Sequence, residues 1–207
     1  NLQSIWMATA QLPSYPSLRE DSSADVCVIG AGMAGLSVAY SLSRLGKSVI
    51  VLESGPLGSG MTRFTTAHLS NAIDDRFIKM ERWHGTEGAK LAGQSHAAAI
   101  DSIERISSHE DIACDFQRVD GYLLLSPTED ERYLDLEFEA AHRAGVIVEK
   151  RARAPGFPSG PCLCFSNQGQ FHPLKYLAGL ATAIERHGGR IFAHTHVRDI
   201  RGGAAAE

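Results

Sequence analysis

Residues 26–36 read VCVIGAGMAGL, an apolar run that ends among three glycines, and no charged residue occurs from Val26 to Ser43. Three interpretations compete: a membrane segment, a buried core element, or a turn that holds a phosphate. A membrane span needs about 20 apolar residues in one helix, each glycine costs such a helix about 1 kcal/mol relative to alanine, and Lys47 follows closely. We therefore predict no membrane span.

The spacing of the glycines favours the phosphate-binding turn. Gly30 ends a strand, Gly32 lets a pyrophosphate approach the backbone, and Gly35 lets the following helix lie close to the strands. The N–H groups of Met33 and Ala34 belong to the same helix start. A glycine-containing core element without a ligand remains the plain alternative for this stretch alone.

The sequence that follows completes a strand–helix–strand unit. The helix ends at Gly46, and a second strand over residues 48–53 ends at Glu53, 18 positions after Gly35. That position suits a carboxylate that binds a ribose hydroxyl. The unit therefore predicts dinucleotide binding, with Gly30, Gly32, Gly35 and Glu53 as its main residues.

A loop rich in glycine, serine and threonine follows the acidic strand, and it favours FAD over NAD because it is long enough to wrap a long cofactor. The residues expected to contact the diphosphate or ribityl chain are Ser54, Gly58, Thr62, Arg63, Thr65 and Thr66. Ala67 and His68 follow, and His68 is expected beside the isoalloxazine ring. An ordinary polar surface loop is the alternative for this set.

These residues resemble a known family. The stretch from residue 25 to 60, DVCVIGAGMAGLSVAYSLSRLGKSVIVLESGPLGSG, resembles the FAD-binding start of the D-amino-acid-oxidase-like family of FAD-dependent oxidoreductases. TTAHLSNAIDDRF is similar to a branch whose members often carry a C-terminal Rieske domain, and GQFHPLKYLAGLATAIERHGGRIFAHTHVRDI resembles the return into the FAD domain. Family members are about twice as long, so the chain is expected to be the N-terminal half of such a protein.

The resemblance implies an activity and a further contact. It implies oxidation of a small-molecule amine, amino acid or alcohol by hydride transfer to flavin N5. Oxygen or a Rieske-type domain outside this sequence is the expected electron acceptor. It also implies that the backbone of Val197 meets the adenine. It names no catalytic residue, because the substrate-binding floor lies downstream in the family. An NAD-dependent dehydrogenase and a truncated, non-catalytic dinucleotide-binding module remain the alternatives.

The predicted fold class is α/β: a Rossmann-like FAD-binding domain with a parallel sheet, plus part of an α+β substrate domain. The predicted segments are an arm over 1–24, the FAD-binding domain over 25–110, a substrate-domain portion over 111–171, and a return to the FAD domain over 172–207. Beyond residue 70, helices are expected over 74–83, 86–109, 128–145 and 173–187. Strands are expected over 115–119, 122–125, 146–148, 162–165, 170–171, 191–193 and 196–200.

Charge and cysteine content narrow the partners. The net charge is −4 and the sequence has no lysine- or arginine-rich run, so we predict that the protein does not bind nucleic acid. The four cysteines follow no zinc or iron–sulfur spacing, which favours reduced thiols, no metal site and a cytoplasmic location.

Overall fold

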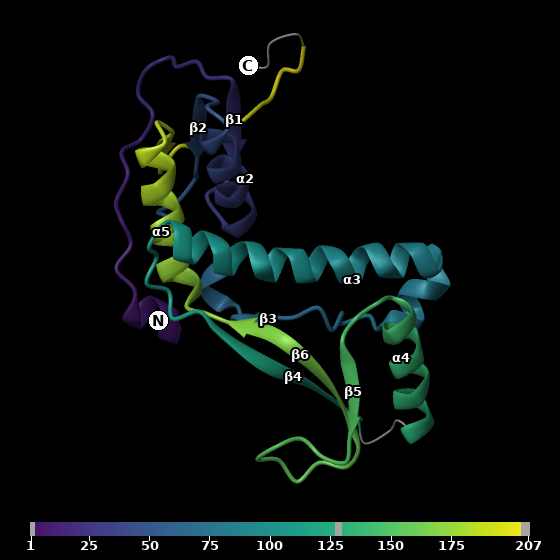
Figure 1. Cartoon of the computed structure of the whole chain (residues 1–207). Coiled ribbons are helices and arrows are strands. Elements are labelled where there is room, and N and C mark those ends of the chain that lie inside the picture. The colour runs from purple at the N-terminus through teal and green to yellow at the C-terminus, as the bar shows by residue number, and fades with distance from the viewer. Residues whose placement is uncertain (1–2, 127–129, 204–207) are drawn as a thin grey trace. The chain divides into compact units, whose positions relative to one another are not determined.

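The computed structural model describes residues 3–126 and 130–203. Two compact units share the chain, and each is described by itself (Figure 1). The first unit contains residues 1–66, 106–114 and 172–207, and the second contains residues 67–105 and 115–171. Residues 67–105 thus group with the second unit, whereas the sequence places them with the FAD-binding segment. The functional assignment of the four predicted segments stays a prediction.

The first unit is built on a parallel sheet in the order β1-β2-β7. Its elements are α1 (Ile5–Thr9), β1 (Val26–Ile29), α2 (Met33–Arg44), β2 (Val49–Leu52), the 3-10 helix η1 (Met61–Phe64), α5 (Pro173–Arg186) and β7 (Arg190–Phe192). Val28 pairs with Val51, and Val51 pairs with Ile191. This is the predicted α/β arrangement, in which α2 connects the parallel strands β1 and β2.

Apolar faces of two helices build the core of the first unit. α2 and α5 contact each other, α2 contacts β1 and β2, and α5 contacts β7. Leu36 and Ala39 on α2 are fully buried, as are Leu177 and Leu180 on α5. Burying a leucine side chain stabilises a fold by about 1.5–3 kcal/mol, so this packing fixes the start of α2 relative to the strands.

The second unit is built on antiparallel strands in the order β3-β6-β4, with β5 also paired to β6. Its elements are β3 (His68–Leu69), α3 (Phe77–His109, of which residues 106–109 belong to the first unit), β4 (Gln117–Leu124), α4 (Glu131–Arg143), β5 (Val148–Arg151) and β6 (Cys162–Gln170). Phe77, Leu163 and Phe165 are fully buried in its apolar core.

Most predicted elements are present, and the differences come from turn-forming residues. The helices expected over 74–83 and 86–109 are joined in one element, α3, which is kinked at Gly85 because this residue has a non-helical backbone (φ 71°). The expected strands 162–165 and 170–171 fall in one strand, β6, which ends at Gln170 and contains Asn167 in a left-handed conformation (φ 59°). The expected strands 115–119 and 122–125 are likewise one strand, β4, with a register shift between Val119 and Gly121.

One predicted strand is wrong, and one predicted boundary lies outside the described residues. Residues 196–200 form no strand: regular pairing ends with β7 at Phe192, and His194, two residues later, adopts a left-handed conformation. Val197 follows in irregular, half-buried chain. The expected helix start at residue 128 lies outside the described residues, and α4 begins at Glu131.

Candidate cofactor site

The glycine turn has the geometry that the sequence predicts. Gly30 directly follows β1 at φ 97°, where its N–H donates to the Leu52 carbonyl at 2.8 Å. A Cβ on Gly35 would overlap the Gly30 carbonyl oxygen, so only glycine lets α2 lie this close to the strand. Gly32 is the N-cap of α2 and has no side chain to cap it, so the helix starts without a side-chain cap.

The start of α2 therefore presents donors without a side-chain acceptor. Met33, Ala34 and Gly35 form its first turn, and their N–H groups precede the first i to i−4 hydrogen bond, which Leu36 N–H donates to the Gly32 carbonyl at 3.0 Å. N–H groups at a helix start, together with the helix dipole, favour an anion such as a phosphate. Beside Gly32 there is space: a Cβ there would meet only Thr62 Oγ1, at 4.0 Å.

Glu53 lies at the end of β2 and faces this turn. Its Oε2 accepts the Ala31 N–H at 2.7 Å, and its Oε1 accepts the Gly55 N–H at 3.0 Å and the Ser54 hydroxyl at 3.2 Å. Burial acts to raise the pKa of the Glu53 carboxyl, but the hydrogen bonds from Gly55, Ala31 and Ser54 outweigh it and hold the pKa below its ordinary value. The carboxylate is thus ionised at neutral pH and fixes the turn.

Sequence reasoning assigns Glu53 to a ribose but misses this second role. A carboxylate has about four acceptor positions, and three are used within the chain, so a position remains for a ribose hydroxyl. The strand-end position of Glu53 is the signal that finds the residue; its hydrogen bond to Ala31 depends on how β2 lies beside the turn.

Two residues of the loop over 54–66 have clear surroundings. Gly58 adopts φ 74°, and a Cβ on it would crowd Leu12 Cδ1 at 2.7 Å and Leu174 Cδ2 at 3.2 Å, so close packing already explains this glycine. The Arg63 guanidinium lies over the Phe64 ring, 4.7 Å from its centroid. Its Nε is buried without a hydrogen-bond partner, so it could donate to an acceptor on a bound ligand.

The last three loop positions differ in their environment. Thr65 is exposed and its carbonyl accepts the Trp6 indole N–H at 2.9 Å, and Thr66 is exposed. Ala67 and His68 belong to the second unit. Ala67 is buried at φ 60°, whereas His68 is exposed on β3 and pairs with Gln170. Within the first unit, the structure gathers the glycine turn, Glu53, Ser54 and Thr62.

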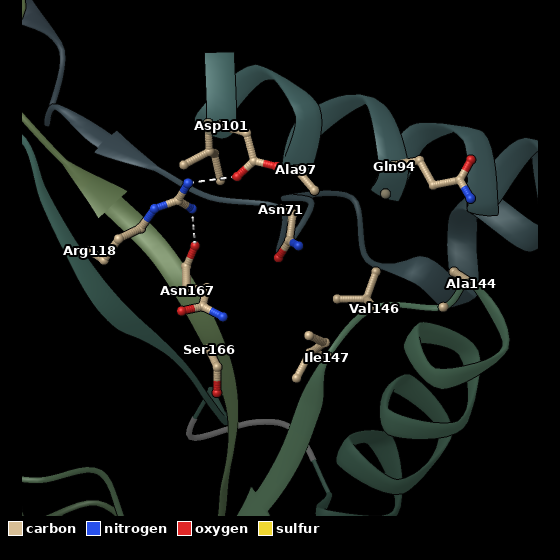
Figure 2. A pocket seen from close by; sticks show the side chains of 13 residues that line it. Asn71, Gln94, Ala97, Asp101, Arg118, Ala144, Val146, Ile147, Ser166 and Asn167 are labelled. Atoms are coloured by element: carbon tan, nitrogen blue, oxygen red, sulfur yellow. Dashed lines mark hydrogen bonds and ion pairs between the residues drawn. The ribbon is translucent and has the colours of Figure 1, made fainter. Parts of the chain in front are cut away.

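A cavity of about 240 Å³ lies in the second unit and includes none of the predicted site residues (Figure 2). On its wall, Arg118 donates to Asp101 at 2.6 Å, to the Asn167 carbonyl at 2.7 Å, and to Glu104 at 3.0 Å through Nε. The guanidinium is thus engaged by α3 and β6. We interpret these contacts as packing α3 onto the sheet rather than as a ligand site.

A family model for FAD dependent oxidoreductases, abbreviated DAO, matches residues 25–207. The chain belongs to this family. The match confirms the resemblance stated from the sequence. The predicted cofactor, FAD, is the cofactor of the family.

Curated relatives match along nearly the whole chain. A putative Rieske 2Fe-2S iron-sulfur protein of Bacillus subtilis is 33% identical over 99% of this chain and 40% of its own length. The gamma-glutamylputrescine oxidoreductase of Escherichia coli is 30% identical over 90% of this chain and 45% of its own length. The chain thus spans less than half the length of these relatives.

Solved structures show the same fold. Glycine oxidase from Geobacillus kaustophilus has a TM-score of 0.71 at 20% identity, over 86% of this chain and 48% of that one. L-Amino acid deaminase from Proteus myxofaciens has a TM-score of 0.72 at 17% identity, over 95% of this chain and 44% of that one. These likenesses confirm the predicted α/β fold class.

Two further kinds of feature are absent from the described residues, a metal-ligand cluster and a membrane-spanning helix. Over residues 3–126 and 130–203, no three or more histidine, cysteine, aspartate or glutamate side chains gather where a metal ion could bind. Over the same residues, no helix has the length and apolar character needed to cross a bilayer.

Proposed function

We propose that the whole protein is an FAD-dependent oxidoreductase and that the first unit holds the adenine half and the diphosphate of FAD. The start of α2 carries this proposal: a helix N-terminus without a side-chain cap lies directly after the Gly30 turn and beside the carboxylate of Glu53. The residues present fit the cofactor, because they offer N–H donors to the phosphates and an ionised acceptor to the ribose.

Each predicted residue has a proposed role. The N–H groups of Gly32, Met33, Ala34 and Gly35 bind the diphosphate, Glu53 binds a ribose hydroxyl, and Gly30 shapes the turn. Ser54, Gly58, Thr62, Arg63, Thr65 and Thr66 belong to the loop that follows the ribityl chain. Ala67 and His68 lie toward the flavin ring, and the Val197 backbone meets the adenine. The buried Nε of Arg63, which has no partner, supports an acceptor near that side chain.

The proposed substrate is a small amine or amino acid, with an alcohol as the second class. The similarity to a gamma-glutamylputrescine oxidoreductase, a glycine oxidase and L-amino acid deaminases supports the first class, and the similarity to an L-alpha-glycerophosphate oxidase supports the second. When bound, FAD would supply the acceptor, at its flavin N5, for a hydride from a substrate carbon. This chain's residues bind and orient the cofactor.

The electron acceptor that reoxidises the protein is proposed to be oxygen or a Rieske-type domain. The Rieske relative at 33% identity supports the second choice. We also propose a cytoplasmic location, which rests on four cysteines outside any disulfide or zinc spacing. An NAD-dependent dehydrogenase is not favoured, since the matching family depends on FAD.

Cofactor loading tests the proposal directly. The full protein is titrated with FAD and, separately, with NAD, while thermal unfolding and flavin fluorescence are followed. A ligand at 100 times its dissociation constant stabilises a fold by about 2.7 kcal/mol, so FAD is expected to raise the melting temperature and NAD is not. Anaerobic addition of amines, amino acids and alcohols then shows which class bleaches the flavin spectrum. Stabilisation by NAD alone would overturn the proposal.

A further inference from the structure

The arm over residues 3–24 lies along the first unit instead of extending away from it. In Figure 1 it runs in purple beside α5. The buried Tyr15 donates its hydroxyl to Glu185 at 3.1 Å, the Pro16 carbonyl accepts the Ala193 N–H at 3.0 Å, and the Leu18 N–H donates to the Thr195 hydroxyl at 3.0 Å. The C-terminal half of the arm is therefore attached to α5 and to the chain after β7.

The N-terminal half of the arm reaches the loop after β2. α1 is a single short helix whose Trp6 donates its indole N–H to the Thr65 carbonyl at 2.9 Å. Further along, Leu12 occupies the space beside Gly58. The arm thus contacts both ends of the loop over 58–65, which follows the ribityl chain in the proposed function.

A chain of hydrogen bonds holds α1 on the start of α5. His172 is the buried N-cap of α5, and its Nδ1 accepts the Lys175 N–H at 3.3 Å. In the neutral ring the proton is then on Nε2, which donates to the Thr9 hydroxyl at 2.9 Å. That hydroxyl donates in turn to the Ile5 carbonyl at 2.6 Å.

The same histidine also fixes the indole. The rings of Trp6 and His172 meet edge to face, with centroids 5.0 Å apart and an interplanar angle of 68°. The His172 ring at the start of α5 therefore orients the indole, and the indole N–H donates to the loop at the Thr65 carbonyl. A backbone carbonyl held by a rigid donor fixes the orientation of its own peptide plane, here the one that joins Thr65 to Thr66.

We propose that Trp6 is a positioning residue for the FAD-binding loop, with α1 and the His172–Thr9 pair as its support. The proposal rests on the proposed function. Trp6 holds the Thr65 carbonyl and so sets the conformation in which the threonines of this loop meet the cofactor. Loss of the indole donor leaves the fold intact and loosens the loop.

The experiment compares four variants of the full protein with the parent. Trp6→Phe removes the donor and keeps an aromatic ring. Thr9→Val removes the hydroxyl that His172 contacts, and Thr9→Ser restores it. Tyr15→Phe is the matched control, because it removes another hydrogen bond of the same arm, one that goes to Glu185 on α5 and not to the loop. The FAD dissociation constant, the visible circular dichroism of the bound flavin at saturation, and the melting temperature are measured.

A net hydrogen bond is worth up to about tenfold in an equilibrium constant. Trp6→Phe and Thr9→Val are expected to weaken FAD binding about three- to tenfold and to change the flavin dichroism, while Thr9→Ser and Tyr15→Phe bind FAD as the parent does. Equal FAD affinity and equal dichroism in all variants would overturn the positioning role alone. A parent protein that binds no FAD would overturn the proposed function, and this proposal with it.

Discussion

The N-termini of two helices in this protein are capped differently: a side chain caps α3, and no side chain caps α2. At α3, in the second unit, the side chain of Glu137 reaches from α4 and accepts the Phe77 N–H at 2.8 Å and the Ile78 N–H at 3.1 Å. At α2, in the first unit, Gly32 offers no side-chain cap, and the nearby carboxylate of Glu53 accepts the N–H of Ala31, the residue before the N-cap. A buried helix start needs an acceptor, which Glu137 supplies at α3. At α2, Gly32 and Ala34 are exposed, and the proposed function places the FAD diphosphate there.

The pKa values of the two carboxyl groups are also shifted in opposite directions. Glu137 is buried, and burial raises the pKa of its carboxyl despite the N–H groups of Phe77 and Ile78, which act to lower it. Glu53 is only partly buried, and its hydrogen bonds lower its pKa. The same kind of donor thus accompanies a raised pKa at the buried carboxyl and a lowered pKa at the partly buried one.

The largest expected effect is on stability at the closed start. Glu137→Ala leaves two buried N–H groups without an acceptor and opens a cavity, which is expected to cost about 3 kcal/mol of unfolding free energy. Urea unfolding measures it. Glu139→Ala, at an exposed position of the same helix, is the control and should stay within about 0.5 kcal/mol of the parent. Equal stability of both variants would contradict the capping role of Glu137.

The next effect is on cofactor affinity at the open start. Glu53→Ala removes the proposed ribose acceptor and the hydrogen bonds to Ala31 and Gly55. FAD binding should weaken about 30-fold, since a hydrogen bond to a charged group is worth about 2 kcal/mol. Fluorescence titration with FAD measures it, and Glu137→Gln serves as the comparison that should keep the parent's affinity. An unchanged affinity in Glu53→Ala would remove Glu53 from the site.

The smallest effect is a difference in pH dependence. The raised pKa of Glu137 means that its contribution is fully present below the ordinary value of 4.5 and is lost as the pH rises through the raised pKa. Relative to Glu137→Gln, the parent should therefore lose stability as the pH rises through that range. Glu53, with a lowered pKa, contributes above 4.5 and loses this contribution as the pH falls. Urea unfolding across the pH series measures the stability difference between the parent and Glu137→Gln, and between the parent and Glu53→Ala. These two differences should change with pH in opposite directions. Changes in the same direction would contradict the comparison.

A further acid-sensitive group sits in the first unit and was not found from the sequence. The buried Glu110 accepts from Tyr40 at 2.6 Å and Arg186 at 2.6 Å, and its pKa is lowered to about 2: burial raises it, but the hydrogen bonds from Tyr40, His109 and His187 and the charge of Arg186 outweigh burial. Tyr40 and Arg186 lie 70 and 76 positions from Glu110 in the sequence, so no local spacing could predict these two partners.

The sequence predicts the open helix start well and the closed one not at all. Gly30, Gly32, Gly35 and Glu53 lie within 24 residues, and local sterics alone require glycine at the turn. Glu137 is an unremarkable acid in an amphipathic helix, 60 positions from Phe77. Likewise, the sequence predicts two strands where β6 is one, and it gives no sign of the left-handed conformation of Asn167 within that strand. Contacts between distant segments and single unusual backbone angles leave no pattern in the sequence.

The most direct test closes the start of α2 with a side chain of its own. Gly32 has an extended backbone (φ −80°, ψ −176°) and open space beside it, so Gly32→Asp is expected to fold and to cap the helix as aspartate does elsewhere. The added charge then repels a diphosphate. Gly160→Asp, at an open position of the second unit, is the matched control. The account predicts a melting temperature equal to or above the parent's, with FAD affinity reduced about 100-fold only in Gly32→Asp. Parent-like FAD affinity in a folded Gly32→Asp protein would contradict it.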